Sequence, residues 1–179
     1  LLFYLAFLAG LYRLALSFED QPRWTALAAG LYAAFAPAFV TRYSLSNDGN
    51  YVEVLALGTW ALWLAVRWAR EPERDRLLAL AGGLLLGLAC WCHILAIIHM
   101  TAFGLALVLA DPRRALRSTP PAAAGWALGY LPGLLWNAQN GWESFLYVLP
   151  GGRKVGALEQ GPDLASRALD MVREQVPVL

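Results

Sequence analysis

Long apolar stretches separated by short polar segments dominate the chain. A bilayer core about 30 Å thick is crossed by about 20 helical residues, with about 17 as the lower limit. Six charge-free or nearly charge-free runs approach that length: Leu1–Phe18, Trp24–Thr41, Tyr51–Val66, Leu77–Trp91, Ile94–Ala110 and Ala122–Trp136. The pattern predicts an all-α fold, a polytopic transmembrane helical bundle of about six spans.

The fourth and fifth runs form one continuous apolar stretch, Leu77–Ala110. As a single helix this stretch would be about 50 Å long, too long for one upright span. Tryptophan and histidine favour the membrane interface. We therefore expect two short spans that meet near Trp91, Cys92 and His93.

The composition agrees with a membrane protein. Hydrophobic residues make up 59% of the 179 residues and charged residues 15%, against about 45–50% and about 25% in ordinary soluble domains. This balance excludes a typical soluble enzyme, a disordered tail and a disulfide-rich secreted module. A net charge of +1 without a concentrated basic face gives no case for a nucleic-acid partner. Cys90 and Cys92, two residues apart, match neither a redox nor a zinc motif and are interpreted as apolar helix packing.

Arginine collects in two segments that we expect to face the cytoplasm. Residues 67–76 carry four arginines and residues 111–117 carry three, and cytoplasmic loops are enriched in basic residues. Alternation places the remaining segments: Glu19–Arg23 inside, and Leu1, Arg42–Asn50, Trp91–His93 and Asn137–Leu179 outside. Arg13, inside the first run, is expected to extend its side chain to the interface.

Both ends of the chain are interpreted as cut. Leu1 opens directly in an apolar run with no Met and no basic leader, and apolar sequence resumes at Val176. We expect residues 1–152 to be a partial transmembrane domain and residues 153–179 an extracytoplasmic segment leading to a truncated next span.

Polar residues that could carry chemistry gather first in the outer segment 42–51. Asp48 lies in an Asn-Asp-Gly-Asn turn, where it is a candidate N-cap of the third helix as well as a candidate site residue. Glu53 follows, about one turn into an apolar helix, where a carboxylate is costly unless it faces water, a cation or a protein cavity. Both the cavity-facing and the interfacial interpretation of Glu53 stay open.

Histidines and a polar segment after the last apolar run are the other candidates. His93 is either a hydrogen-bonded structural histidine or a ligand-facing residue at an outer helix end. His99, six residues on, cannot share a helix face with His93 as i, i+4 metal ligands would, and we expect it to face the bundle interior. Trp136 and Trp142 flank the end of the last apolar run, and the enrichment of tryptophan at membrane interfaces alone explains them.

Three of these stretches resemble a known family: residues 42–51, residues 83–93 (GLLLGLACWCH) and residues 131–145 (LPGLLWNAQNGWESF). The last is similar to the P-x-x-x-W-N-x-x-x-G-W-x-S-F run common in bacterial members of the family 39-like, GT-C-fold membrane glycosyltransferases. These are relatives of protein mannosyltransferases and of the lipid A aminoarabinose transferase.

The resemblance implies an enzyme of the bacterial inner membrane with its active face outside the cytoplasm. Such enzymes move a sugar from a polyprenyl-phosphate carrier to a lipid, glycan or protein hydroxyl. A carboxylate in the first outer loop acts as general base, and cations or a divalent metal steady the departing phosphate. Leu1–Phe18 resembles the family's second span, so the catalytic aspartate is expected upstream of Leu1; the metal and its ligands stay open.

The resemblance also implies site residues. Asp48 matches the aspartate of the second outer loop in a supporting catalytic role, although relatives often have T-P-D where this chain has Ser46-Asn47-Asp48. His93 stands where relatives often carry lysine or asparagine, available to the carrier phosphate, but it is a weaker permanent cation. The predicted substrate- and carrier-binding residues are Arg42, Tyr43, Asn47, Glu53, His93, Asn137, Asn140, Trp142 and Glu143.

Two other classes of function remain open at the level of sequence. A transporter or lipid-handling membrane protein would use short Gly- and Pro-interrupted helices, but the interruptions at Gly82-Gly83 and Pro132-Gly133 do not resemble repeats of each other. A non-catalytic assembly subunit that shares the fold is the third.

Overall fold

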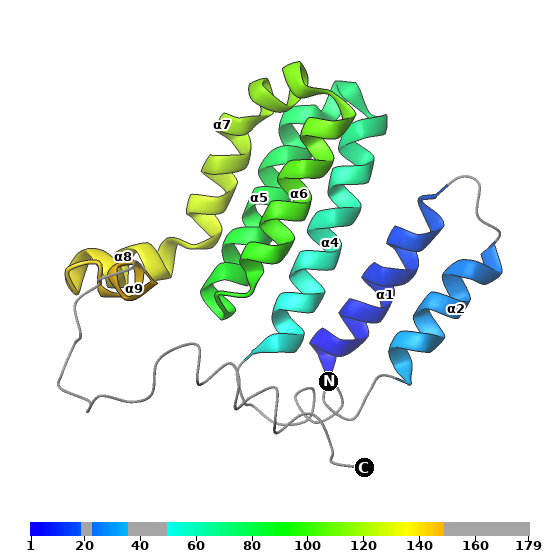
Figure 1. The fold of residues 1–179 in the computed structure, drawn as a ribbon, viewed down its shortest axis with the longest axis horizontal. Helices are drawn as coiled ribbons and strands as arrows, with labels where there is room; N and C mark the ends of the chain where they lie inside the picture. The colour runs from blue at the N-terminus through cyan, green and yellow to red at the C-terminus, as the bar shows by residue number, and fades with distance from the viewer. Residues whose placement is uncertain (19–22, 36–49, 149–179) are drawn as a thin grey trace, which may run out of the picture. The chain divides into compact units, whose positions relative to one another are not determined.

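The computed structural model describes residues 1–18, 23–35 and 50–148. This part of the chain is helical and contains no strand (Figure 1), which confirms the all-α prediction. Its elements are α1 (Leu2–Leu16), α2 (Arg23–Ala34), α4 (Tyr51–Arg70), the short 3-10 helix η1 (Pro72–Arg74), α5 (Asp75–Cys92), α6 (Ala96–Ala110), α7 (Pro112–Gly129), α8 (Leu131–Gln139) and α9 (Glu143–Val148).

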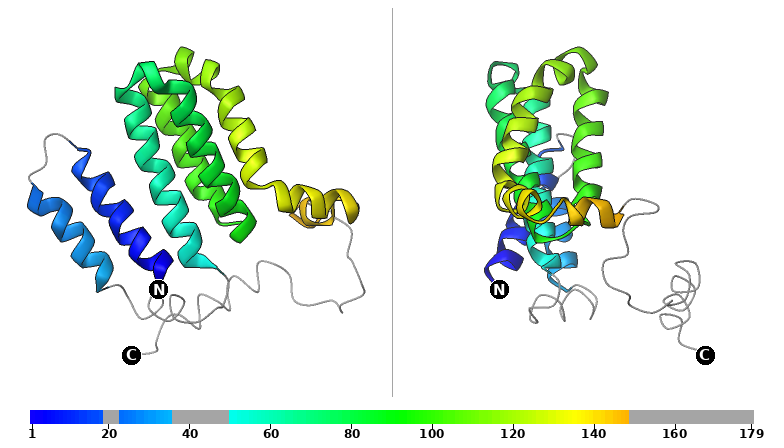
Figure 2. Two further views of the ribbon diagram at one scale, coloured as in Figure 1. Left: turned by 180° about the vertical axis from the view of Figure 1, so that it is seen from behind. Right: turned by 90° about the vertical axis from the view of Figure 1, so that its left-hand side faces the viewer.

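The chain divides into two compact units, residues 1–136 and residues 137–179. In the first unit, successive long helices run in alternating directions (Figures 1 and 2). The α4–α5 and α6–α7 connections therefore lie at one end of the bundle, which we call the basic end because it carries residues 67–76 and 111–117. The start of α4 and the α5–α6 turn lie at the other end, which we call the His93 end.

Helix α4 is the centre of the first unit, with α1, α5 and α6 packed against it. Small residues on α4 and α5 let the helices approach closely, and Trp68 fills the space near the basic end with no exposed surface. The buried core comprises Ala61, Ala65, Trp68, Leu78, Ala79, Leu86, Phe103, Leu107 and Ala115.

Helices α5 and α7 run in the same direction and form the most extensive contact in the bundle (Figure 1). Each carries a Gly-x-x-x-Gly pair, Gly83 with Gly87 and Gly125 with Gly129. A Cβ added at any of the four glycines would overlap backbone atoms of the opposite helix. This reciprocal close approach is typical of helix pairs in membranes, where small residues let backbones touch.

Two further glycines make room for ring side chains. Gly10 of α1 receives the Trp60 indole, whose Nε1 donates to the Ala6 carbonyl at 2.9 Å. Gly58 of α4 receives the ring of His99, which occupies the space that a Cβ would need. His99 is therefore directed at α4, as expected for a residue facing the bundle interior.

Two of the described helical segments, Tyr51–Arg70 and Pro72–Cys92, are long and apolar enough to cross a membrane; Leu2–Leu16 and Ala96–Ala110 are shorter apolar helices. The predicted break of the long apolar stretch is confirmed. Helix α5 ends at Cys92, His93 is extended with φ −163° and ψ 147°, and α6 begins at Ala96.

The sixth predicted run has different bounds. Residues 111–117 are not a separate loop, because the Asp111 carboxylate caps α7 by accepting from the Arg114 N–H at 3.0 Å and Pro112 is the first helical residue. The helix continues through Pro120 and Pro121 and ends at Gly129. Asn50 occupies the N-cap position of α4 with no side-chain cap, and the candidate cap Asp48 lies outside the described residues.

Much of the side surface of the bundle is apolar. On α6 alone, Ile98 is 62% exposed and Leu109 75% exposed, and its other exposed large residues are Ile97, Leu105 and Val108. Soluble monomers rarely expose apolar surface this continuously.

Candidate functional site

The candidate site in the first unit lies at the His93 end. The rings of Tyr51 and His93 pack with centroids 4.8 Å apart, and the Asn50 side-chain amide donates to the Cys92 carbonyl at 3.5 Å. These contacts join the start of α4 to the α5–α6 turn, so the structure brings Glu53 and His93 to the same end of the bundle, as predicted.

The hydrogen bonds around His93 fix its ring. Its backbone N–H donates to the Ala89 carbonyl at 3.0 Å and so ends α5, while its Nδ1 accepts from the Leu95 N–H at 3.1 Å. Because Nδ1 is an acceptor, this pattern assigns the proton of the neutral imidazole to Nε2. The side chain is half-buried, which leaves it able to present an N–H donor at the surface.

Glu53 lies in the first turn of α4, where a carboxylate interacts favourably with the helix dipole. It stands between the buried Val52 and Val54, is itself half-buried, and acts electrostatically on the Cys92 thiol. The carboxylate therefore sits beside the α5 terminus, and it makes no ion pair with any other residue that the structure describes.

Four predicted site residues, Arg42, Tyr43, Asn47 and Asp48, lie outside the described residues. Their places relative to Glu53 and His93 stay predictions.

The predicted site residues after Trp136 lie in α8, α9 and the turn that joins these two short helices. The Asn137 carbonyl accepts from the Trp142 N–H at 2.8 Å, and its side-chain Oδ1 accepts from the Ser144 N–H at 3.2 Å. Gly141 and Trp142 both adopt positive φ, at 65° and 62°. Asn137, with 1% exposure, thus caps α9.

This geometry accounts for much of the W-N-x-x-x-G-W-x-S-F pattern without a ligand, because Asn137, Gly141 and Ser144 build the turn. Asn140, Trp142 and Glu143 are exposed, and the Trp142 and Phe145 rings lie 5.8 Å apart. Trp142 and Glu143 remain available to a ligand, whereas Asn137 has a structural role that the sequence alone did not reveal.

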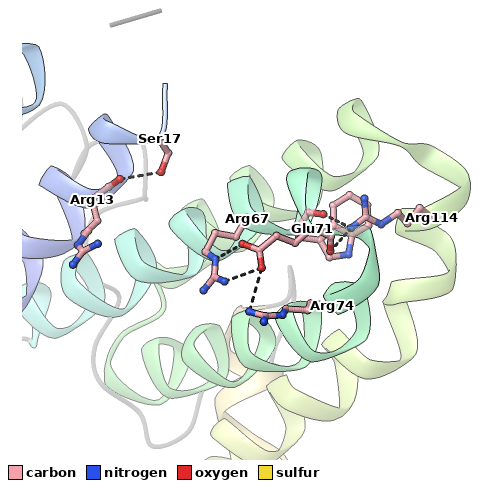
Figure 3. Close-up of polar contacts among 7 residues, drawn as sticks. Arg13, Ser17, Arg67, Glu71, Arg74 and Arg114 are labelled. Carbon is pink, nitrogen blue, oxygen red and sulfur yellow. Dashed lines mark hydrogen bonds and ion pairs between the residues drawn. The ribbon is translucent and has the colours of Figure 1, made fainter. Parts of the chain in front are cut away.

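The basic end contains a buried polar cluster that the sequence did not predict. Arg114 is 8% exposed, and its guanidinium donates to the backbone carbonyls of Trp68, Ala69 and Glu71 at the end of α4 (Figure 3). It also lies 4.0 Å from the Trp68 ring centroid, and its Nε is 3.7 Å from the Asp75 carboxylate. Arg114 therefore joins α4, α5 and α7 by capping α4 with a cation.

The same end carries a more exposed ion-pair group. Arg67 donates to both carboxylate oxygens of Glu71, at 2.7 and 2.8 Å, and Arg74 approaches Glu71 at 3.5 Å (Figure 3). The hydrogen bonds from Arg67, opposed in part by desolvation and aided by the two positive charges, hold the pKa of Glu71 below its ordinary value.

An apolar groove of about 360 Å³ lies between α6 and α7 over Gly83 and Leu86 of α5. Its walls include Phe103, Leu107 and Trp126, and no charged side chain lines it. The groove could accept a hydrocarbon chain but offers no group for catalysis.

No three His, Cys, Asp or Glu side chains gather as metal ligands within the described ranges. No family model, curated protein or solved structure matches the chain.

Proposed function

We propose that the chain is part of a polytopic membrane glycosyltransferase. The enzyme moves a sugar from a polyprenyl-phosphate carrier to a lipid, glycan or protein acceptor on the extracytoplasmic face of a bacterial inner membrane. The observation that supports the membrane part most strongly is a bundle with apolar sides between two polar ends, one of them rich in arginine. The reaction is supported by the resemblance of residues 42–51, 83–93 and 131–145.

In this proposal the basic end faces the cytoplasm and the His93 end faces outward. We assign α1, α2, α4, α5, α6 and α7 to the six spans expected from the apolar runs; of these, the α4 segment Tyr51–Arg70 and the α5 segment Pro72–Cys92 are long and apolar enough by themselves. The touching backbones of α5 and α7 fit this environment. In lipid the hydrophobic effect does not drive helices together, and association depends instead on the close packing that small residues allow.

The chemistry assigned to the His93 end is binding and orientation. His93 offers an Nε2–H donor to an anionic or hydroxyl oxygen without carrying a permanent charge. Glu53 offers an acceptor to a sugar or acceptor hydroxyl. Asp48 is proposed to support the reaction from the second outer loop, while the general base itself lies upstream of Leu1.

A transfer assay on membranes that carry the full-length protein, with the sequence upstream of Leu1 included, tests the proposal, with polyprenyl-phosphate sugars as donors. Glu53→Gln and Asp48→Asn should each lower transfer about tenfold, the loss expected for one hydrogen bond to a charged group. The matched control is Glu73→Gln, an exposed carboxylate at the basic end, which should leave transfer unchanged.

Unchanged transfer in both site variants would remove Glu53 and Asp48 from the mechanism. Absence of transfer by the full-length wild-type protein, with the protein still embedded in membranes, would contradict the glycosyltransferase proposal and favour the transporter or lipid-handling alternative.

A further inference from the structure

Two arginines lie at the same level of the α1–α4 pair near the basic end. The parallel helices are held in register by the Trp60 indole on the Ala6 carbonyl and by Arg70 on the Ser17 carbonyl. At that register Arg13 of α1 lies level with Arg67 of α4, and their guanidinium groups point to the same side of the view in Figure 3.

The charges of this group are not balanced among the described residues. Glu71 is shared between Arg67 and Arg74, and no carboxylate in the described ranges lies within ion-pair distance of Arg13. Arg13 is exposed, and the Arg67 side chain is 31% exposed. Among the described residues, one carboxylate therefore serves two of these three arginines, and positive charge is in excess.

The surroundings of the pair are apolar and aromatic. The Arg67 guanidinium lies 5.0 Å from the Trp63 ring centroid, and Trp63 packs edge-on against Trp60 at 5.3 Å. On α1, Tyr12 and Leu16 are both exposed beside Arg13. Arginine with tryptophan about one turn from a helix end is the composition of a membrane interface at the depth of lipid headgroups.

We propose that Arg13 and Arg67 bind the phosphate of an anionic phospholipid of the cytoplasmic leaflet, with its acyl chains along α1 and α4. The inference rests on the membrane placement proposed above. A lipid is favoured over a soluble anion because the exposed apolar residues next to the arginines would stay in contact with water if only a small anion bound. Juxtamembrane arginines each contribute about 1 kcal/mol of attraction to anionic lipid, which corresponds to about fivefold in affinity.

The test begins with flotation of the chain on vesicles of phosphatidylcholine alone, which checks membrane placement separately. Purified protein from nanodiscs that also contain phosphatidylglycerol is then analysed by native mass spectrometry for retained lipid. Arg13→Gln should lower the affinity for phosphatidylglycerol about fivefold. Glu71→Gln should raise it, because Arg67 and Arg74 lose their competing carboxylate, and a purely structural role of Glu71 would not produce that gain.

Arg117→Gln is the matched control for the general attraction of basic residues to anionic lipid, since Arg117 is an exposed arginine of α7 at the same end of the bundle; its loss should lower the affinity for phosphatidylglycerol by less than the loss of Arg13. Equal losses in Arg13→Gln and Arg117→Gln would overturn the site in favour of unspecific attraction. Displacement of the lipid by millimolar inorganic phosphate would overturn it in favour of a soluble anion. Flotation without any preference for phosphatidylglycerol would reject the lipid site and leave the membrane proposal intact.

Discussion

Arg114 shows how one side chain can hold a helix junction together. Three carbonyls at the end of α4, the Asp75 carboxylate and the Trp68 ring all surround its guanidinium. A buried cation of this kind is tolerated because hydrogen bonds and a counter-charge replace water. The indole of Trp68 donates in turn to Ser118 Oγ at 3.1 Å, which ties the same point to α7 a second time.

We expect Arg114→Met to lower the free energy of unfolding by about 3 kcal/mol, because it leaves the α4 carbonyls and Asp75 without their partner. The stability of Arg114→Lys should lie between that of the wild type and that of Arg114→Met, since an ammonium keeps the charge but loses the planar fork of donors. Unfolding of detergent-solubilised protein measures the difference. The neighbouring Arg113→Gln is the control, because Arg113 is exposed and its loss should change stability by less than about 0.5 kcal/mol; equal effects at the two positions would contradict the buried role of Arg114.

Glu71 makes stability depend on pH. Its pKa is lowered in the folded state by the hydrogen bonds from Arg67, so the stabilisation is fully present above the unfolded-state pKa of a glutamate and is lost as pH falls through the lowered folded pKa. The wild type should be more stable than Glu71→Gln at neutral pH, and the difference should disappear in acid. A difference that is constant from neutral to acidic pH would show that the carboxylate charge is not responsible.

Among the helices, the α5–α7 pair has the least tolerance for change. Its four glycines bring two backbones into contact, and the nearest atoms are carbonyl oxygens and amides rather than side chains that could move aside. The contact between α4 and α6 is different, because a histidine ring fills the space left by Gly58.

Gly83→Val should lower stability by more than about 3 kcal/mol, since the added carbons would have to push α7 away from α5. Gly104→Ala on α6 is the matched control, because nothing lies within 4 Å of its added Cβ and alanine is the better helix former by about 1 kcal/mol. Thermal unfolding of the two purified variants compares them directly. Similar stability for both would mean that α5 and α7 do not touch through these glycines.

The His99 contact can be tested by a double-mutant cycle. Gly58→Ala alone should be destabilising, because the methyl group meets the His99 ring, whereas the same change in a His99→Ala background should cost little. Additive effects of the two substitutions would place the ring elsewhere.

On the scale of the whole molecule, the class of fold could be predicted from the sequence, whereas several details of the site could not. Apolar runs and the Trp91–His93 interruption predicted the main helices and the α5–α6 break, because helix length and hydrophobicity are local properties. The burial of Arg114 could not be predicted, since an arginine in a basic run is usually solvated and only the packing of α4 against α7 encloses it. The capping role of Asn137 depends on a turn that brings Ser144 back to it, which no spacing rule specifies.

The central claim is that the bundle spans a membrane with its basic end in the cytoplasm and its His93 end outside. The most direct measurement labels single cysteines with a membrane-impermeant maleimide in intact cells, after Cys90 and Cys92 are replaced by serine. Asn50→Cys at the His93 end and Arg117→Cys at the basic end are both exposed positions. We expect labelling of Asn50→Cys in intact cells and of Arg117→Cys only after permeabilisation; labelling of Arg117→Cys in intact cells, or recovery of the chain in the soluble fraction, would contradict this membrane placement.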